Sequence, residues 1–139
     1  MVTPLSVIYA EDDPFTRALY QEMLGEHFSD VRLAASGHEA MLLYRQRPCG
    51  LLLTDLFMPD MNGLELFRKL RGYDPELPLV IISSHDEGEL VLETANLGID
   101  GYLLKPVTPG LLQHTLGRVT ERRAARHQQI AIKIGRAHV

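Results

Sequence analysis

Short apolar runs alternate with amphipathic segments along most of this chain. The runs have the length of β-strands, and most are apolar without interruption, as strands are when helices cover both faces of a sheet. The pattern predicts five strands, at residues 5–10, 31–35, 50–54, 78–83 and 101–104.

A helical period of apolar residues fills the interval after each predicted strand. The predicted helices are 14–28, 37–47 and 63–72, a fourth that begins near Glu87 and Glu89 and ends at Gly98, and a fifth after Thr108. Their predicted core-facing residues are Phe15, Ala18, Leu19 and Met23; Ala40, Leu43 and Tyr44; Leu66, Phe67 and Leu70; Val91, Leu92 and Ala95; and Leu111, Leu112, Thr115, Leu116 and Val119.

Helix start signals agree with this division. Asp13-Pro14 and Thr108-Pro109 each place a capping residue before a proline. Ser36 and Asn62 are each followed three residues later by a glutamate, the spacing of a capping box. A strand–helix unit repeated five times predicts an α/β fold, a doubly wound parallel sheet with right-handed crossovers and helices on both faces.

Composition agrees with a single soluble domain, since the chain has 139 residues, 45% hydrophobic and 23% charged. The single cysteine, Cys49, excludes an internal disulfide, and the scattered histidines lack the spacing of zinc ligands. The chain shows neither a signal peptide nor an apolar run of membrane-spanning length. A cytoplasmic location without membrane contact is therefore expected.

Charge is distributed unevenly along the chain. Residues 1–117 carry 17 acidic and 8 basic side chains, whereas residues 118–139 carry 1 acidic and 6 basic. The acidic body argues against direct nucleic-acid binding by this domain, and the basic segment is interpreted as a solvated helix face or linker. Residues 1–120 are the predicted domain, and residues 121–139 a helical extension, a linker or a tail derived from expression.

Polar residues stand at the carboxyl ends of four of the apolar strands. Glu11-Asp12-Asp13 follow the first, Asp55 the third and Lys105 the fifth, while Ser83 ends the fourth. Because the carboxyl ends of parallel strands share one edge of a sheet, which is where open α/β sheets bind ligands, these groups should converge. Each of them alone is an ordinary cap or turn residue. Their shared position at strand ends is what indicates a site.

Crowded carboxylates repel one another unless a cation joins them. Oxygen ligands without histidine or thiolate favour a hard ion, Mg²⁺ or Mn²⁺. A lysine and a serine hydroxyl can hold phosphate oxygens, and one carboxylate remains as a nucleophile. The combination predicts phosphoryl transfer to an aspartate.

Four motifs resemble those of the two-component response-regulator receiver family, over about residues 4–120. The first is Val7-Ile8-Tyr9-Ala10-Glu11-Asp12-Asp13-Pro14, and the second is Leu53-Thr54-Asp55-Leu56-Phe57-Met58-Pro59-Asp60-Met61-Asn62-Gly63. The others are Ile81-Ile82-Ser83-Ser84 and Gly101-Tyr102-Leu103-Leu104-Lys105-Pro106. Their order and spacing match the family. The resemblance implies a flavodoxin-like sheet of strand order 2-1-3-4-5.

The resemblance also implies a role for each residue of the site. Asp55 would accept a phosphoryl group from a phosphohistidine on a sensor histidine kinase or a histidine phosphotransfer protein. Asp12, Asp55 and the backbone carbonyl of Phe57 would bind Mg²⁺ directly, and Glu11 would bind it through water. Lys105 would pair with the phosphoryl group, and its bond to the following proline is expected to be cis.

The switch residues follow from the same resemblance. Ser83 would move toward the new phosphate, and Tyr102 would turn inward. The added charge would thereby change the surface of the fourth helix, fifth strand and fifth helix. The chain is thus expected to be a signalling phosphoacceptor, active in its own phosphorylation and dephosphorylation, rather than an enzyme.

Some positions depart from the usual family pattern. Glu11 stands where aspartate is commoner, and Ser84 follows the switch serine where alanine or glycine is frequent. Phe57 and His85 occupy positions that commonly tune dephosphorylation, so the lifetime of the phosphorylated state is left open. The fourth and fifth helices lack matched basic and acidic residues for a symmetric dimer. A homodimer and the identity of the output domain or protein are therefore left open too.

Other functions fit only part of the pattern. An aspartate-nucleophile phosphatase needs a second acid two residues after the nucleophile, and that position is Phe57. A receiver-fold scaffold that works without phosphorylation would be expected to lack Asp12, Asp55 or Lys105, and all three are present. Flavin or nucleotide binding needs a phosphate loop that this sequence does not contain.

Overall fold

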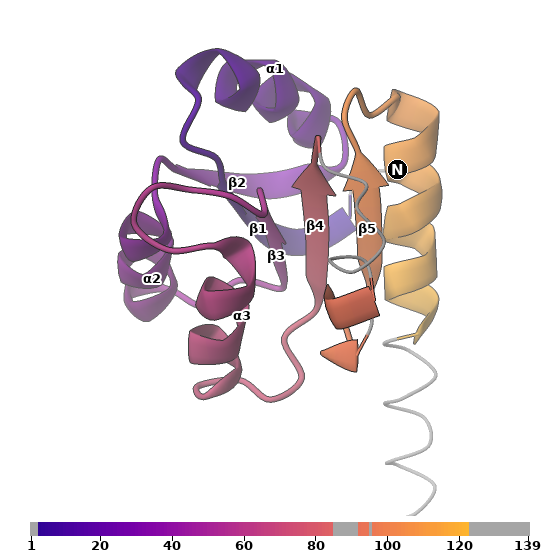
Figure 1. Ribbon diagram of the computed structural model, residues 1–139. Coiled ribbons are helices and arrows are strands. Elements are labelled where there is room, and N and C mark those ends of the chain that lie inside the picture. The colour runs from indigo at the N-terminus through magenta and orange to yellow at the C-terminus, as the bar shows by residue number, and fades with distance from the viewer. Residues whose placement is uncertain (1–2, 85–91, 95, 123–139) are drawn as a thin grey trace, which may run out of the picture. The chain divides into compact units, whose positions relative to one another are not determined.

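Five parallel strands form the sheet of this protein, whose structure is a computed structural model that describes residues 3–84, 92–94 and 96–122. The strands are β1 (Thr3–Ala10), β2 (Phe28–Ala34), β3 (Leu51–Thr54), β4 (Leu79–Ser83) and β5 (Gly101–Leu104). Their order in the sheet is β2-β1-β3-β4-β5 (Figure 1). The predicted flavodoxin-like α/β fold and its strand order are confirmed.

Three helices have bounds close to the predicted ones: α1 (Pro14–Gly25), α2 (Gly37–Gln46) and α3 (Gly63–Arg71). Each begins at the predicted cap. The side chains of Asp13, Ser36 and Asn62 accept hydrogen bonds from the backbone N–H three residues later. These bonds satisfy donors that the first helical turn leaves without partners, and so fix where each helix starts.

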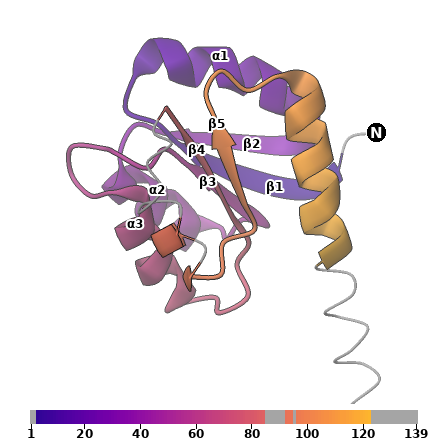
Figure 2. The same cartoon turned by 45° about the vertical axis from the view of Figure 1, so that its right-hand side comes forward.

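The two faces of β1 pack against different helices. Ile8 and Ala10 belong to a buried cluster with residues of α2 and α3. Tyr9, on the opposite face, makes an edge-to-face contact with Tyr20 of α1. Figures 1 and 2 show α1 on one side of the sheet and α2 and α3 on the other. The alternation of side chains along a strand thus gives each helix layer its own part of the core.

The core-facing residues of α2 and α3 are as predicted, but those of α1 are not. Tyr20 and Leu24 are buried, whereas Phe15 and Leu19 are 81% and 56% exposed. Ala18 is exposed as well, and Met23 is half-buried. The helix carries two neighbouring apolar stripes, and packing against Tyr9 selects the one that contains Tyr20. Periodicity alone does not distinguish the two stripes.

Residues 92–94 and 96 are helical, and Gly98 has a φ of +74°, a left-handed conformation that favours glycine at a helix end. Leu92, predicted to face the core, is 67% exposed, while Thr94 is buried. Glu87, Glu89, Val91 and Ala95 lie outside the described residues. Among the described residues, no helix is both long and apolar enough to span a bilayer.

The chain divides into two compact units, Met1–Val107 and Thr108–Val139. In the second, residues 109–122 are helical, and Thr108 caps this helix by accepting a hydrogen bond from the Leu111 N–H. The predicted domain boundary at residue 120 stays a prediction. The prediction for the tail concerns mainly residues 123–139, which lie outside the described residues.

A close backbone approach follows β3. A Cβ atom added at Gly63 would lie 2.5 Å from the Asp55 carbonyl oxygen and 3.0 Å from the Thr54 methyl group. The Gly63 N–H also donates a hydrogen bond to the Leu56 carbonyl. The segment between β3 and α3 can close on itself only because residue 63 has no side chain.

We therefore expect Gly63→Ala to lower the free energy of unfolding by about 1–3 kcal/mol, because backbone atoms must move to admit the methyl group. Gly117→Ala is the matched control. Gly117 is an exposed helical residue with open space around its Cα, so alanine there should raise the unfolding free energy by up to about 1 kcal/mol. Urea denaturation measures both changes. Equal effects of the two substitutions would contradict the close approach.

Candidate phosphoacceptor site

The parallel register of the sheet brings the acidic residues to one level. Ala10 of β1 pairs with Ala34 of β2 and with Thr54 of β3. The ladder continues one residue further, since the Glu11 N–H donates to the Ala34 carbonyl and the Asp55 N–H to the Ala10 carbonyl, each at 2.9 Å. Glu11 and Asp55 therefore leave neighbouring strands side by side.

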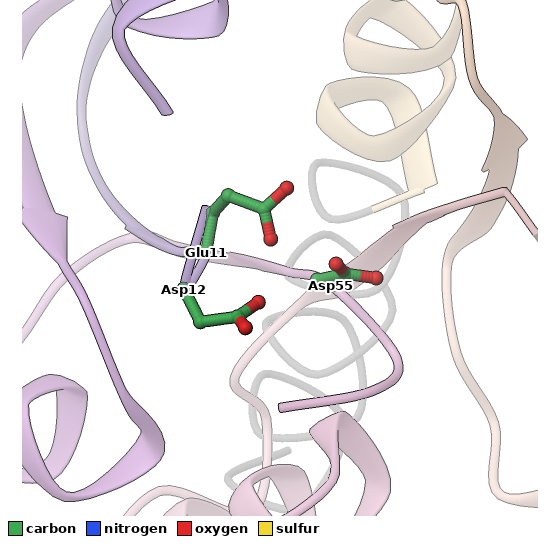
Figure 3. A group of neighbouring side chains, drawn as sticks. All are labelled: Glu11, Asp12 and Asp55. Atoms are coloured by element: carbon green, nitrogen blue, oxygen red, sulfur yellow. The ribbon is translucent and has the colours of Figure 1, made fainter. Parts of the chain in front are cut away.

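Three carboxyl groups gather at this edge of the sheet. One carboxylate oxygen each from Glu11, Asp12 and Asp55 lies within 4.8 Å of the others. Figure 3 shows the Glu11 and Asp12 side chains, from the end of β1, extending toward the side of Asp55, from the end of β3. Glu11 is buried, Asp55 is half-buried and Asp12 is exposed, so the group is open to solvent on one side.

Lys105 reaches this acidic group from the end of β5. Its N–H donates to the Ser83 carbonyl at 2.9 Å, which fixes the start of the segment after β5. Its Nζ atom lies 2.7 Å from Glu11 Oε1 and 3.3 Å from Asp55 Oδ2. These partners are 94 and 50 residues away in the sequence. The bond between Lys105 and Pro106 is cis, as predicted.

Burial and neighbouring charges shift the pKa values of Glu11 and Lys105. Burial and the neighbouring Asp55 carboxyl group raise the pKa of Glu11 to about 7, although the hydrogen bond from Lys105 acts in the opposite direction. Burial alone would lower the pKa of Lys105, but its contacts with Glu11 and Asp55 outweigh burial and raise it. One lysine therefore only partly compensates three carboxyl groups.

The donor set fits a hard divalent cation. It consists of carboxylate oxygens, which Mg²⁺ and Mn²⁺ prefer, and the open side leaves room for the waters that Mg²⁺ retains. Glu11 Oε2 is buried and has no hydrogen-bond partner among the described residues. A cation or its bound water would satisfy that oxygen and offset the repulsion within the group.

The other predicted site residues lie on β4 and β5 or just after β3. Ser83 is fully buried at the end of β4 and is tied to Lys105 through its carbonyl. Tyr102, on β5, is half-buried and packs against the core cluster. Phe57 lies two residues after Asp55, with its side chain 46% exposed. The switch roles of Ser83 and Tyr102 and the ligand role of the Phe57 carbonyl stay predictions.

Two supporting residues were not identified from the sequence. Arg17 donates from Nη1 to the Glu11 carbonyl at 2.7 Å, and thereby holds the segment between β1 and α1. Asp60 accepts hydrogen bonds from the Gly37 and His38 N–H groups, which docks the segment after Asp55 on the start of α2. Arg17 lies six residues after Glu11, in the helix that follows the acidic run, so the local sequence could have indicated that it contacts this run. The contacts of Asp60 join residues more than 20 positions apart, so no local pattern in the sequence indicates them.

Comparison with known proteins identifies the family. Residues 7–117 match the family described as the response regulator receiver domain. This chain is a receiver domain of two-component signalling. The acidic group of Glu11, Asp12 and Asp55 is consistent with the phosphoacceptor site of such domains and is typical of their magnesium site.

Individual relatives agree with this assignment. The transcriptional activator protein ExaE of Pseudomonas putida is 30% identical over 132 residues, which cover 94% of this chain and 62% of ExaE. The chemotaxis protein CheY-3 of Vibrio cholerae is 26% identical, over 85% of this chain and 93% of CheY-3. A receiver domain protein from Methanospirillum hungatei JF-1 superposes with a TM-score of 0.78 at 25% identity, over 88% of this chain and 99% of that one. The receiver thus spans less than two thirds of ExaE.

The raised pKa of Glu11 predicts a pH dependence of stability. Between about pH 5 and pH 7, folded Glu11 keeps a proton that the unfolded chain, with a pKa near 4.5, has lost. In EDTA, the free energy of unfolding contributed by Glu11 should therefore fall as the pH rises through this window and stay constant above it.

Glu11→Gln isolates this contribution, because its side chain does not ionise. From pH 5 to pH 7.5 the unfolding free energy of the variant should rise relative to that of the original protein by about 1–3 kcal/mol. Urea denaturation at both pH values measures the difference. Glu22→Gln, on the exposed surface of α1, is the control. A difference for Glu11→Gln that is the same at both pH values would contradict the raised pKa.

Proposed function

We propose that Asp55 accepts a phosphoryl group from a phosphohistidine on a histidine kinase or a histidine phosphotransfer protein, with Mg²⁺ as the cofactor. The observation that carries the proposal is the arrangement of three carboxyl groups within 4.8 Å and one lysine in contact with two of them. Membership of the receiver family supports the same function and the same class of partner.

Asp55 is better suited than Glu11 to act as the nucleophile. The Glu11 side chain is only 1% exposed and its pKa is about 7, so it is enclosed and partly protonated near neutral pH. Asp55 keeps 14% of its side chain exposed beside Lys105. In the proposed transfer, an Asp55 oxygen forms a bond to phosphorus, the phosphorus–nitrogen bond breaks, and the electron pair of that bond remains on the leaving imidazole.

Asp12, Asp55 and the Phe57 carbonyl would hold Mg²⁺ directly, and Glu11 would hold it through water. When bound, the cation supplies charge neutralisation for the phosphoryl oxygens. The protein's part is positioning. Arg17 and the sheet register fix Glu11, while the docking of Asp60 on α2 holds the segment that carries Phe57.

Lys105 would pair with a phosphoryl oxygen after transfer. Its present partners, Glu11 and Asp55, are the groups nearest to the incoming phosphate, so a small movement of the ammonium group suffices. Ser83, whose backbone is bonded to that of Lys105, would then move toward the phosphate, and Tyr102 would turn inward on β5. The phosphate charge thereby becomes a change of shape around β5.

Asp55→Asn should abolish phosphorylation and leave the fold intact, because the amide keeps the shape and removes the nucleophile. Intact mass after incubation with acetyl phosphate and Mg²⁺ should show one added phosphoryl group on the original protein and none on the variant. Asp13→Asn is the matched control, since it removes a nearby charge and keeps a good helix cap. It should still be phosphorylated.

EDTA should prevent the mass increase in every variant. A receiver that gains no phosphoryl group from acetyl phosphate or from a phosphohistidine donor would contradict the proposed function. A mass increase on Asp55→Asn equal to that of the original protein would show that another residue is the acceptor.

Lys105→Ala should still bind Mg²⁺, at least as tightly as the original protein does, because lysine is not a ligand of the cation and its removal leaves more negative charge for the cation to neutralise. It should lose the response to phosphate. Amide chemical shifts at Ser83 and Tyr102, measured by NMR before and after addition of acetyl phosphate, should change in the original protein and stay constant in the variant. An unchanged response in Lys105→Ala would exclude the proposed pairing.

A further inference from the structure

A buried tyrosine of α1 is hydrogen-bonded to the segment that carries Lys105. The Tyr20 hydroxyl accepts a hydrogen bond from the Val107 N–H at 3.0 Å, and both residues are buried, with 3% and 5% of their surface exposed. The bond joins residues 87 positions apart in the sequence. Figures 1 and 2 show the segment that leaves β5 passing beside α1.

This bond fixes the far end of a three-residue segment. At its near end, the Lys105 N–H donates to the Ser83 carbonyl of β4. At its far end, the Val107 N–H has the Tyr20 hydroxyl as its acceptor. The backbone from Lys105 to Val107 is therefore held by β4 on one side and by α1 on the other, and this backbone determines where the Lys105 side chain starts.

The hydroxyl is needed because Val107 is buried. A buried backbone N–H without an acceptor costs free energy comparable to a lost hydrogen bond. If the Tyr20 hydroxyl were absent, the segment would gain by moving until the Val107 N–H found water or another acceptor. Such a movement would carry Lys105 with it, away from the 2.7 Å contact with Glu11 and the 3.3 Å contact with Asp55.

We infer that Tyr20 is a positioning residue for phosphoryl transfer, which holds Lys105 beside Asp55 through the Val107 N–H. The inference rests on the proposed function of Lys105. Within the part of the chain that the structure describes, Tyr20 makes no hydrogen bond to a carboxyl group of the site. It would therefore act only through the backbone of the segment after β5.

The neighbouring tyrosine supplies a matched control. Tyr9 is fully buried, and its ring lies 6.2 Å from that of Tyr20 at an angle of 87°. Its hydroxyl has no hydrogen-bond partner among the described residues. Both rings contribute to the same packing, but only the Tyr20 hydroxyl is bonded to the segment of Lys105. Removal of each hydroxyl in turn therefore distinguishes the effect of the Tyr20–Val107 hydrogen bond on Lys105 from the effect of ring packing.

The experiment compares Tyr20→Phe and Tyr9→Phe in the full chain. The rate of phosphorylation by limiting acetyl phosphate at saturating Mg²⁺ should fall about three- to tenfold in Tyr20→Phe, since small displacements of a positioned group reduce rates strongly. The rate should be unchanged in Tyr9→Phe. The dissociation constant of Mg²⁺, measured by isothermal titration calorimetry, should be unchanged in both variants. Exchange of the Val107 amide hydrogen, followed by NMR, should accelerate only in Tyr20→Phe.

Three outcomes would overturn the inference. An unchanged rate in Tyr20→Phe at a temperature where both variants are folded by circular dichroism would leave the hydroxyl without a role in transfer. Equal losses of rate and Mg²⁺ affinity, or an equal loss in Tyr9→Phe, would indicate general disturbance of the site. Failure of the original protein to accept any phosphoryl group would contradict the proposed function and, with it, the role of Tyr20 in transfer. Unchanged Val107 exchange in Tyr20→Phe would contradict only the effect of the hydrogen bond on the segment after β5.

Discussion

The contact of Lys105 with Glu11 and Asp55 is the interaction on which the site depends. Three carboxyl groups close together at the edge of a sheet repel one another, and one half-buried ammonium group lowers this repulsion without removing it. The remaining negative charge is what a divalent cation would neutralise. A phosphoryl group would enter the same balance by taking Lys105 from its present partners. The fold thus holds the site in a state that both events can change.

Backbone hydrogen bonds set the positions of the residues that carry these charges. Glu11, Asp55 and Lys105 each donate their N–H to the carbonyl of a neighbouring strand, one residue beyond the regular ladder. The site residues are therefore extensions of the sheet rather than parts of separate loops. Because a parallel sheet fixes the register of its strands, a group that follows one strand has a determined height relative to a group that follows the next. The edge of the sheet thus holds the candidate site residues in positions that loops alone would hold less firmly.

The supporting contacts come from the helix layers on both sides of the sheet. On one side, Arg17 and Tyr20 of α1 bind the backbone near Glu11 and after Lys105. On the other side, the start of α2 binds Asp60 in the segment after Asp55. The segments after β1, β3 and β5, which carry the candidate site residues, are thus each held by a neighbouring helix. In the proposed phosphoryl transfer, positioning and charge neutralisation supply most of the catalysis, so these contacts would support the groups that react.

Local patterns along the chain were enough to predict the strand–helix alternation, the caps and the convergence of Glu11, Asp12, Asp55 and Lys105. These depend on local periodicity, local hydrogen bonding and the rule that parallel strands end at a common edge. Which stripe of α1 is buried depends on packing in the folded protein, because Phe15 and Tyr20 both lie in apolar stripes and the choice depends on the contact of Tyr20 with Tyr9. The tertiary structure also decided the contacts of Asp60 and Tyr20 and the raised pKa of Glu11. Those properties arise from groups far apart in the chain, whose distance and burial no local pattern contains.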